Sequence, residues 1–282
     1  MDKVTVAFFG TGMLGAAMVR AMLERGITVR IWNRTAQKAQ ALEPLGAQAF
    51  DDPAEAARGA QRIHLCLNDD ASVDAVIDAA LAGISPEAPI VDHTTVLPQR
   101  VAQRAQRLCE AGYSFVHAPV FMGPPMAAQA NGVMMVSGDD ELVGRVRGAL
   151  EAMCSDLRYV GPRPEDAAIY KLMGNAMILA VVGGINDMLR IAEVQTLSRE
   201  RAYALFEFYD PCGQIRGRGK RMVAQEYEPV WTLAMAHKDA VLMQTAAHHE
   251  RLPVIDAMEA LLRNVADRGL GDLDLAAVAA RP

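Results

Sequence analysis

The sequence has little cysteine, and the few cysteines it has are far apart. Four occur in 282 residues, and no pair has the spacing of a metal-binding or redox motif. Free, buried thiols are the expected state of such residues, which fits the reducing cytoplasm. His237, His248 and His249 lack the carboxylate or thiol partners that would complete a zinc site. We therefore expect a cytoplasmic protein without a bound metal.

Two further absences narrow the class of protein. No block of lysine or arginine is present and the formal net charge is -6, so charge gives no reason to expect nucleic acid. No uninterrupted apolar run reaches membrane-spanning length, even between Ile178 and Ile185, so no membrane partner is expected. The apolar run from Val4 is short and meets Gly10, which favours a strand over a signal peptide. With 51% hydrophobic and 22% charged residues, the composition is that of a globular protein.

The first half alternates short β-rich runs with helical patterns. This alternation predicts βαβ units and a mostly parallel sheet. The expected strands are Val4–Phe9, Val29–Trp32, Ile63–Leu67, Ile90–His93, Tyr113–His117, Met134–Ser137 and Leu157–Val160. The expected helices are Met13–Glu24, Pro53–Gly59, Ser72–Leu81, Pro98–Ala111 and Asp140–Met153.

After Pro164 the pattern changes to helix alone. Glu165–Glu193 has no proline and predicts one helix of about 43 Å, at about 1.5 Å per residue. Such a length suits a connection between two domains, and 282 residues favour two domains over one. We therefore predict an α/β Rossmann domain over 1–162, then an interdomain helix and an all-helical domain over 163–282. Further helices are expected over Ser198–Tyr209, Thr232–His249 and Pro253–Asp267.

A glycine-rich segment marks the end of the first expected strand. Gly10-Thr11-Gly12-Met13-Leu14-Gly15 fits G-x-G-x-x-G in the strand-to-helix context that dinucleotide sites need. Gly10 allows a tight turn, Gly12 lets the backbone approach a pyrophosphate, and Gly15 lets helix and strand pack closely. The N–H groups at the helix start can bind phosphate. The segment predicts a dinucleotide site over Gly10, Thr11, Gly12, Met13 and Leu14, with a ligand-free glycine turn as the alternative.

The end of the second strand indicates which dinucleotide binds. NAD sites usually have an Asp or Glu there to accept from the ribose hydroxyls. This sequence has Asn33, Arg34 and Thr35 instead, which leaves no carboxylate to repel a 2′-phosphate and adds a forked cation and a hydroxyl donor. We therefore predict NADP(H). In the alternative, Arg34 is a solvated surface residue and Thr35 caps a helix over Ala36–Leu42.

Five segments together carry a resemblance to a known family. In order, they are the glycine motif continued to Met18, with Leu14 where the family has methionine; Asp92-His93-Thr94-Thr95-Val96-Leu97-Pro98; Ala118-Pro119-Val120; Lys171-Leu172-Met173-Gly174-Asn175; and Lys238-Asp239. Their order over nearly the whole chain resembles the β-hydroxyacid dehydrogenase family, which includes 3-hydroxyisobutyrate dehydrogenases. The resemblance implies the same two-domain fold, and a homodimer or homotetramer.

The resemblance makes Lys171 the general acid or base. Hydride transfer to a carbonyl leaves an alkoxide that an acid must protonate. Lys171 has apolar neighbours on the expected long helix, and partial desolvation there lowers a lysine's pKa. Asn175 is four residues later on the same helix face and can hold the lysine or the substrate. Spacing alone would favour a snorkelling lysine and a surface asparagine.

Other functional residues are expected at strand ends. Thr94 and Thr95 follow a strand at the carboxyl edge of the sheet, where ligands bind. The resemblance places Thr95 beside the nicotinamide or the substrate, while capping of the helix at Pro98 competes as the role of Thr94. Leu67 and Asn68 follow another strand and are expected near the adenosine side.

Lys238 resembles the cofactor-side lysine of the family. In the alternative, Lys238 and Asp239 form an ordinary charged pair at a helix surface. His93 and His117 flank two of the motifs. They are interpreted as satisfied polar residues rather than as groups that bind an anion or carry a proton.

The segment after Ala118-Pro119-Val120 departs from the family. Where the family has Ser-Gly-Gly to hold a substrate carboxylate, this chain has Phe121, Met122 and Gly123, followed by two prolines that lack N–H donors. Phe121 and Met122 make the pocket more apolar, or they pack inward while other donors take over. The predicted substrate site comprises Thr95, Phe121, Met122, Gly123, Lys171 and Asn175.

These observations predict an NADP(H)-dependent oxidoreductase for a small carbonyl or hydroxy compound with an anionic group. A 3-hydroxy acid, a semialdehyde, and a phosphonate or sulfonate analogue all fit. One alternative is an imine reductase of the same plan, against which Lys171 argues and which Tyr170 keeps open. The other is a non-catalytic NADPH-binding protein, because fold alone does not fix function.

Overall fold

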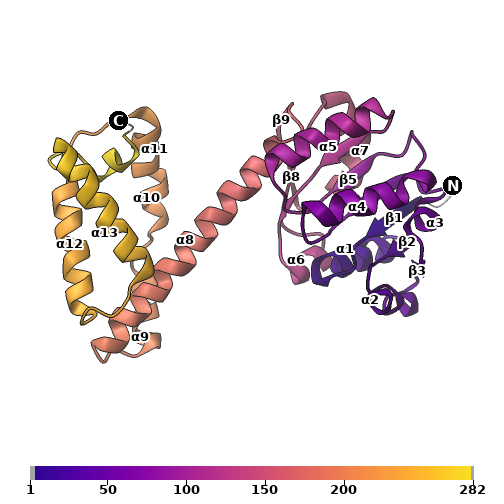
Figure 1. Ribbon diagram of the computed structural model, residues 1–282. Coiled ribbons are helices and arrows are strands. Elements are labelled where there is room, and N and C mark those ends of the chain that lie inside the picture. Colours follow the sequence, from indigo (N-terminus) through magenta and orange to yellow (C-terminus); the bar gives the residue numbers. More distant parts are fainter. Residues whose placement is uncertain (1–3, 281–282) are drawn as a thin grey trace. The chain divides into compact units, whose positions relative to one another are not determined.

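The computed structural model describes residues 4–280 (Figure 1). The outer ends of the two predicted domains, residues 1–3 and 281–282, lie outside the described residues. The chain divides into two compact units, of which the first ends at Asn175 and the second begins at Ala176. This division falls within the long helix α8 (Asp166–Val194), which runs without a break through Gly174 and Gly183. The domain boundary at residue 162 stays a prediction from the sequence.

The first unit is built on one sheet, whose strand order is β3-β2-β1-β4-β5-β6-β8-β7, with β9 beside β8. The pairs from β3 to β6 are parallel, whereas β8 is antiparallel to β6 and β7. The order reverses between β1 and β4, as in Rossmann folds. The strands are β1 (Thr5–Phe9), β2 (Thr28–Trp32), β3 (Gln48–Ala49), β4 (Arg62–Leu65), β5 (Ile90–Asp92), β6 (Phe115–His117), β7 (Val120–Phe121), β8 (Val133–Ser137) and β9 (Asp156–Gly161).

Helices cover both faces of this sheet, and each face has its own core. In β1, Val6 and Phe8 join the core that includes residues of α1 and α7, while Ala7 and Phe9 join the core of α3, α4 and α5. Burial on both faces explains why the strands read as nearly continuous apolar runs. The helices are α1 (Met13–Glu24), α2 (Ala36–Gln40), α3 (Pro53–Ala57), α4 (Asp70–Ala80), α5 (Pro98–Glu110), α6 (Pro124–Ala128), α7 (Asp140–Glu151) and the 3₁₀ turns η1 (Glu43–Leu45) and η2 (Leu81–Gly83).

The second unit is helical, as predicted. Asp187 of α8 is buried and accepts from the N–H groups of Val254 (2.8 Å) and Ile255 (3.0 Å). This carboxylate therefore fixes α8 to the first turn of α13. The elements that follow α8 are α9 (Arg199–Tyr203), η3 (Ala204–Glu207), α10 (Cys212–Arg216), α11 (Arg218–Ala224), α12 (Leu233–Ala246), α13 (Pro253–Val265), the π-type turn η4 (Ala266–Leu270) and η5 (Leu275–Ala279).

The predicted fold class is confirmed, and the differences lie in short elements. The sequence did not predict β3, β7, α6, α10 or α11, because two to seven residues are too few to show a period. Length and composition alone would also let α8 cross a membrane, although it contains no uninterrupted apolar run of that length. Helices that pack against protein meet the same two criteria.

Candidate functional site

A cavity of about 540 Å³ opens at the carboxyl edge of the sheet, where the strand order reverses. Ligands of doubly wound proteins bind at this point, because the loops there diverge. The cavity is lined from three strand ends and two helices. Its lining residues are Gly10, Gly12, Trp32, Asn33, Arg34, Thr35, Lys38, Cys66, Leu67, Asn68, Ser72, Ala75, Val76 and Ala79.

The three motif glycines are required for different reasons. Gly10 has a φ of +97°, and a Cβ there would overlap the carbonyl of Cys66. A Cβ on Gly15 would overlap the carbonyl of Gly10, so helix and turn pack closely. A Cβ on Gly12 would have no atom within 4 Å. Gly12 thus leaves open the space that a pyrophosphate needs.

Asn33 joins the glycine loop to the end of β2. Its Oδ1 accepts from the N–H of Thr11 at 3.0 Å, and its Nδ2 donates to the carbonyl of Thr35 at 2.9 Å. Thr11 is buried, and its hydroxyl has no hydrogen-bond partner within residues 4–280. A buried hydroxyl without a partner costs free energy unless a ligand satisfies it. The arrangement fits a dinucleotide.

Two cations lie at this cavity just beyond the end of β2. Arg34 and Lys38 both line it and are both exposed. Thr35 occupies the N-cap position of α2, but its side chain makes no capping bond, so its hydroxyl is available. Sequence reasoning missed Lys38 and Ser72. Lys38 could have been predicted from its place in the first turn of the helix expected after Thr35, only four residues from Arg34.

The other predicted cofactor residues of the first unit are spread more widely. Leu67 and Asn68 line the cavity. Leu14 packs against the core of α1, and Met13 is 85% exposed, so neither side chain is among the lining residues. Thr95 is exposed on the loop after β5 and does not line the cavity either.

Thr94 fastens two loops together rather than capping a helix. Its hydroxyl accepts from the N–H of Leu67 at 3.0 Å, and its own N–H donates to Asp92 Oδ1 at 2.9 Å. Leu97, not Thr94, occupies the N-cap of α5. The capping interpretation of Thr94 was therefore wrong, because its buried hydroxyl is already used between strands β4 and β5.

A row of buried histidines crosses the sheet. His93 Nδ1 lies 2.7 Å from the carbonyl oxygen of Ala118, which only accepts, so a neutral His93 carries its proton on Nδ1. His93 Nε2 then accepts from His64 Nδ1 at 2.9 Å, and His64 Nε2 accepts from Arg62 Nε at 2.7 Å. Burial lowers the pKa of His93 to about 4, in keeping with the neutral form. We call Arg62, His64, His93 and the Ala118 carbonyl the histidine relay.

His117 lies beside this relay. Its Nε2 donates to the carbonyl of Thr94 at 3.0 Å, and burial lowers its pKa to about 4. Both His93 and His117 are thus buried polar residues that hold loop backbone. His93 is thus a satisfied polar residue, as interpreted from the sequence, whereas the buried Nδ1 of His117 has no hydrogen-bond partner within residues 4–280.

Lys171 is the only predicted acid–base group in the first unit, and its surroundings are mainly apolar. Its ammonium donates to the carbonyl of Val120 at 2.7 Å and lies 4.3 Å from the centre of the Phe121 ring. Burial lowers the pKa of Lys171. Asn175 is half-buried, and the hydrogen bond of Lys171 goes to Val120 rather than to Asn175.

Phe121 and Met122 do not share one role. Met122 packs against the core of α1 and α7, so it turns inward. Phe121 lies against α8, where the absence of a side chain at Gly174 makes room for its ring. Gly123 occupies the N-cap position of α6. The two alternatives from the sequence thus apply to different residues: Met122 packs inward, and Phe121 adds apolar surface beside Lys171.

Lys238 belongs to the second unit. It lies on α12, is exposed, and forms an ion pair with Asp239 at 2.9 Å. This pair matches the simpler of the two interpretations from the sequence. The cofactor role of Lys238 stays a prediction.

Within residues 4–280, no cluster of three potential metal-ligating side chains occurs. Both ring nitrogens of His93 and the Nε2 of His117 are already used in the hydrogen bonds described above. Comparison with known families shows which class of cofactor this part of the chain binds. The family described as the NAD binding domain of 6-phosphogluconate dehydrogenase matches residues 5–161. The chain belongs to this family. It is an NAD(P)-dependent oxidoreductase of the superfamily that includes 3-hydroxyisobutyrate dehydrogenases.

Three relatives align over nearly the whole chain. An uncharacterized oxidoreductase of Bacillus subtilis is 26% identical, over 97% of this chain and 98% of the relative. Glyoxylate/succinic semialdehyde reductase 1 of Arabidopsis thaliana is 25% identical, over 97% and 96%. Mitochondrial 3-hydroxyisobutyrate dehydrogenase of Drosophila melanogaster is 24% identical, over 97% and 87%. These relatives bear out the resemblance seen in the motifs.

Solved structures agree on the fold. The imine reductase of Myxococcus stipitatus in complex with NADP⁺ has a TM-score of 0.89 at 21% identity, over 97% of this chain and 98% of that one. A Streptomyces aurantiacus imine reductase has a TM-score of 0.88 at 23% identity, over 98% of both. At such identities the likeness establishes the Rossmann sheet, the long helix and the helical second unit.

Proposed function

We propose that this chain is an NADP(H)-dependent reductase, or the reverse dehydrogenase, for a small carbonyl compound with an anionic group. The observation that carries this proposal is the setting of Lys171. A half-buried ammonium, held by one backbone carbonyl and one aromatic ring, is a proton donor with few competing partners.

The cavity at the glycine motif supports the choice of NADP(H). Gly10, Gly12 and the unpaired Thr11 hydroxyl suit a pyrophosphate, while Arg34 and Lys38 suit a 2′-phosphate. Among its lining residues no carboxylate is present to accept from a 2′-hydroxyl. When bound, the nicotinamide supplies or accepts a hydride.

Lys171 would then move the proton. In the reducing direction its ammonium protonates the alkoxide oxygen, and in the oxidising direction its free amine removes the hydroxyl proton. A lowered pKa helps both directions, because it brings the two protonation states closer in population near neutral pH. Asn175, one helical turn further along α8, is placed to orient the substrate.

The anionic group of the substrate is proposed from the relatives and from Lys171 itself. Reductases of glyoxylate and succinic semialdehyde, and 3-hydroxyisobutyrate dehydrogenases, are named for carboxylate substrates. In this chain Phe121 stands beside Lys171 where the family has a serine, which adds apolar surface and removes a hydroxyl donor. Carboxylate, phosphonate and sulfonate substrates therefore need direct comparison.

The test is NADPH consumption, followed at about 340 nm, over an acceptor panel of carboxylate semialdehydes, keto-phosphonates, keto-sulfonates and cyclic imines. We expect turnover of one anionic carbonyl class, loss of at least about a hundredfold in kcat for Lys171→Ala, consistent with typical acid–base contributions, and a reductive rate that falls as pH rises through the lysine pKa. Lys220→Ala, an exposed lysine of α11, is the matched control.

Three results would count against the proposal. Turnover of imines only, with kcat unchanged in Lys171→Ala, would support an imine reductase. Tight NADPH binding without turnover of any acceptor would support a non-catalytic binding protein. Equal use of NADH would leave the enzyme class but remove the cofactor assignment.

We also propose that the chain forms a homodimer or homotetramer. Helix α8 exposes Met177, Ile178, Leu179, Val181 and Val182, each by more than half of its surface. A contiguous apolar surface of this kind usually marks an interface. Light scattering after size exclusion should give twice or four times the mass of 30.4 kDa. A monomer at micromolar concentration would contradict this.

A further inference from the structure

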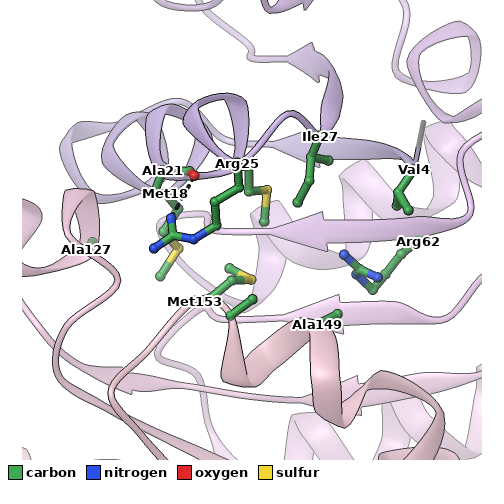
Figure 2. Close-up of a pocket in the computed structure, with 11 residues that line it drawn as sticks. Val4, Met18, Ala21, Arg25, Ile27, Arg62, Ala127, Ala149 and Met153 are labelled. Carbon is green, nitrogen blue, oxygen red and sulfur yellow. Dashed lines mark hydrogen bonds between the residues drawn. The ribbon is translucent and has the colours of Figure 1, made fainter. Parts of the chain in front are cut away.

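A second cavity lies at the amino edge of the sheet, away from the strand ends that carry the glycine motif. Its volume is about 180 Å³. The end of α1 and the end of α7 cover it, and the starts of β1, β2 and β4 form its base (Figure 2). The lining residues are Val4, Met18, Ala21, Met22, Arg25, Ile27, Arg62, Ala127, Ala149, Ala152 and Met153.

The walls are apolar, with two guanidinium groups as the charged part. Figure 2 shows Ile27 and Met153 between the side chains of Arg25 and Arg62 in this view. Arg25 donates to the carbonyl of Ala21 at 2.7 Å, and Arg62 donates through Nε to His64 at 2.7 Å. Neither arginine has a carboxylate within 4 Å among residues 4–280.

Arg25 is exposed to solvent, whereas Arg62 is half-buried beside the apolar cavity and has no carboxylate partner among residues 4–280. Burial of Arg62 lowers its pKa, which shows that the protein surroundings destabilise its charge. An arginine in such a place is normally paired with an anion. Within residues 4–280 the terminal nitrogens of Arg62 make no hydrogen bond, because His64 uses only Nε.

We propose that this cavity is a second ligand site, for an aromatic monocarboxylate of the size of benzoate. The ring would occupy the apolar part, and the carboxylate would accept from Arg62, with Arg25 adding attraction. A cavity of about 150 Å³ is known to take up benzene, so a cavity of this volume accommodates one ring. Methionine side chains adapt to the shape of a ring, and Met18, Met22 and Met153 all line the cavity.

The histidine relay gives this site a built-in reporter. The charge of Arg62 is one cause of the lowered pKa of His64, after burial. An anion on Arg62 would offset that charge and change the polarisation of the bond from Nε to the His64 ring. Binding should therefore shift the ring nitrogen signals of His64, while the exposed His249 stays unchanged.

The experiment is calorimetric titration of the whole chain with benzoate, benzamide and acetate, with NADP⁺ at saturation. NADP⁺ is included so that its own cavity is filled. We expect saturable benzoate binding, and at least tenfold weaker binding of benzamide, which lacks the charge, and of acetate, which lacks the ring. Nitrogen-15 spectra of histidine should show the His64 shift in the same titration.

Two variants locate the site independently. Ala149→Phe, on the half-exposed side of α7, fills the cavity without removing charge, and Arg25→Gln removes one cation without touching the relay. Each should weaken benzoate at least threefold, whereas Arg20→Gln, an exposed arginine of α1 outside the cavity, should not. Thermal unfolding of each variant shows that it is folded.

Absence of saturable binding to the wild-type chain would overturn the proposal. So would equal affinity for benzoate in the wild type and in Ala149→Phe, since this result places benzoate elsewhere. None of these outcomes depends on the proposed enzymatic function, because no turnover is measured.

Discussion

The ring of Phe121 occupies the space that a side chain at residue 174 would fill. A Cβ on Gly174 would overlap the Cζ of Phe121, while the face of the same ring lies 4.3 Å from the ammonium of Lys171. The identity of residue 174 thus decides where Phe121 stands, and Phe121 contributes to the surroundings of Lys171. A departure from the family sequence at residue 121 is accommodated by a glycine more than fifty residues later.

Gly174→Ala should therefore lower kcat by about tenfold or more, because the new methyl displaces the ring beside the Lys171 ammonium and small misplacements of reacting groups slow a reaction by up to about a hundredfold. Phe121→Ser removes the ring, and in that background Gly174→Ala should have little further effect. Steady-state kinetics of the two single variants and the double variant measure this coupling. Additive effects would show that the two residues act separately. Gly184→Ala, in open space on the same helix, is the control.

Arg34 and Lys38 should set the preference for NADPH over NADH. Replacing either with alanine should raise the KM for NADPH about tenfold or more, since a charge-assisted hydrogen bond contributes about 1.5–3 kcal/mol. The KM for NADH should hardly change, because NADH has no 2′-phosphate. Arg58→Ala, an exposed arginine that does not line the cavity, serves for comparison. Equal losses with both cofactors would contradict the assignment.

The buried histidines should make the first unit sensitive to acid. The folded-state pKa values of His93 and His117 are about 4, below the ordinary value of 6.5, so the unfolded chain takes up protons first. Stability is then complete above pH 6.5 and falls as pH drops towards 4, by about 3 kcal/mol per histidine.

Urea unfolding at several pH values measures this dependence. His93→Gln should flatten the pH profile of the unfolding free energy between pH 6.5 and 4, although it lowers stability at neutral pH. His249→Asn, at an exposed histidine, should leave the profile unchanged. A wild-type profile that is flat over this range would show that the histidines are already charged in the folded state.

The carboxylate of Asp274 should contribute strongly to the stability of the second unit. It is buried and accepts from the N–H groups of Ala276, Trp231 and Val230, and it pairs with Arg218 at 3.2 Å. Burial by itself raises a carboxyl pKa, but these partners hold the pKa of Asp274 well below its usual range. Its contribution is therefore present at neutral pH and is lost only as pH falls through that low value.

Asp274→Asn should lower the unfolding free energy of this unit by about 3 kcal/mol, because it leaves two partly buried arginines, Arg218 and Arg221, without their carboxylate. Asp210→Asn breaks an exposed pair with Arg216 and should have a much smaller effect on the unfolding free energy, because solvent screens the pair. The fluorescence of Trp231 during denaturation, measured in a Trp32→Phe background, separates this unit from the first. Similar costs for the two variants would contradict the prediction.

The sequence by itself determined the class of fold and the place of the cofactor. Periods of two and 3.6 residues revealed the alternating strands and helices, and the glycine spacing marked the turn after β1. The run from Asn33 to Thr35 likewise identified one wall of the cavity. These features are local, because they depend on neighbours within one turn or one strand.

Only the tertiary structure decided the contacts between distant segments. The ring of Phe121 lies against Gly174, the Thr94 hydroxyl binds Leu67, and the relay runs from Arg62 to Ala118. These contacts join residues that are 27 to 56 positions apart. No periodic pattern encodes such pairs, since they arise where strand ends and helices meet in space. The same reason explains why a cavity lined by two arginines at the amino edge of the sheet could not be predicted from the sequence.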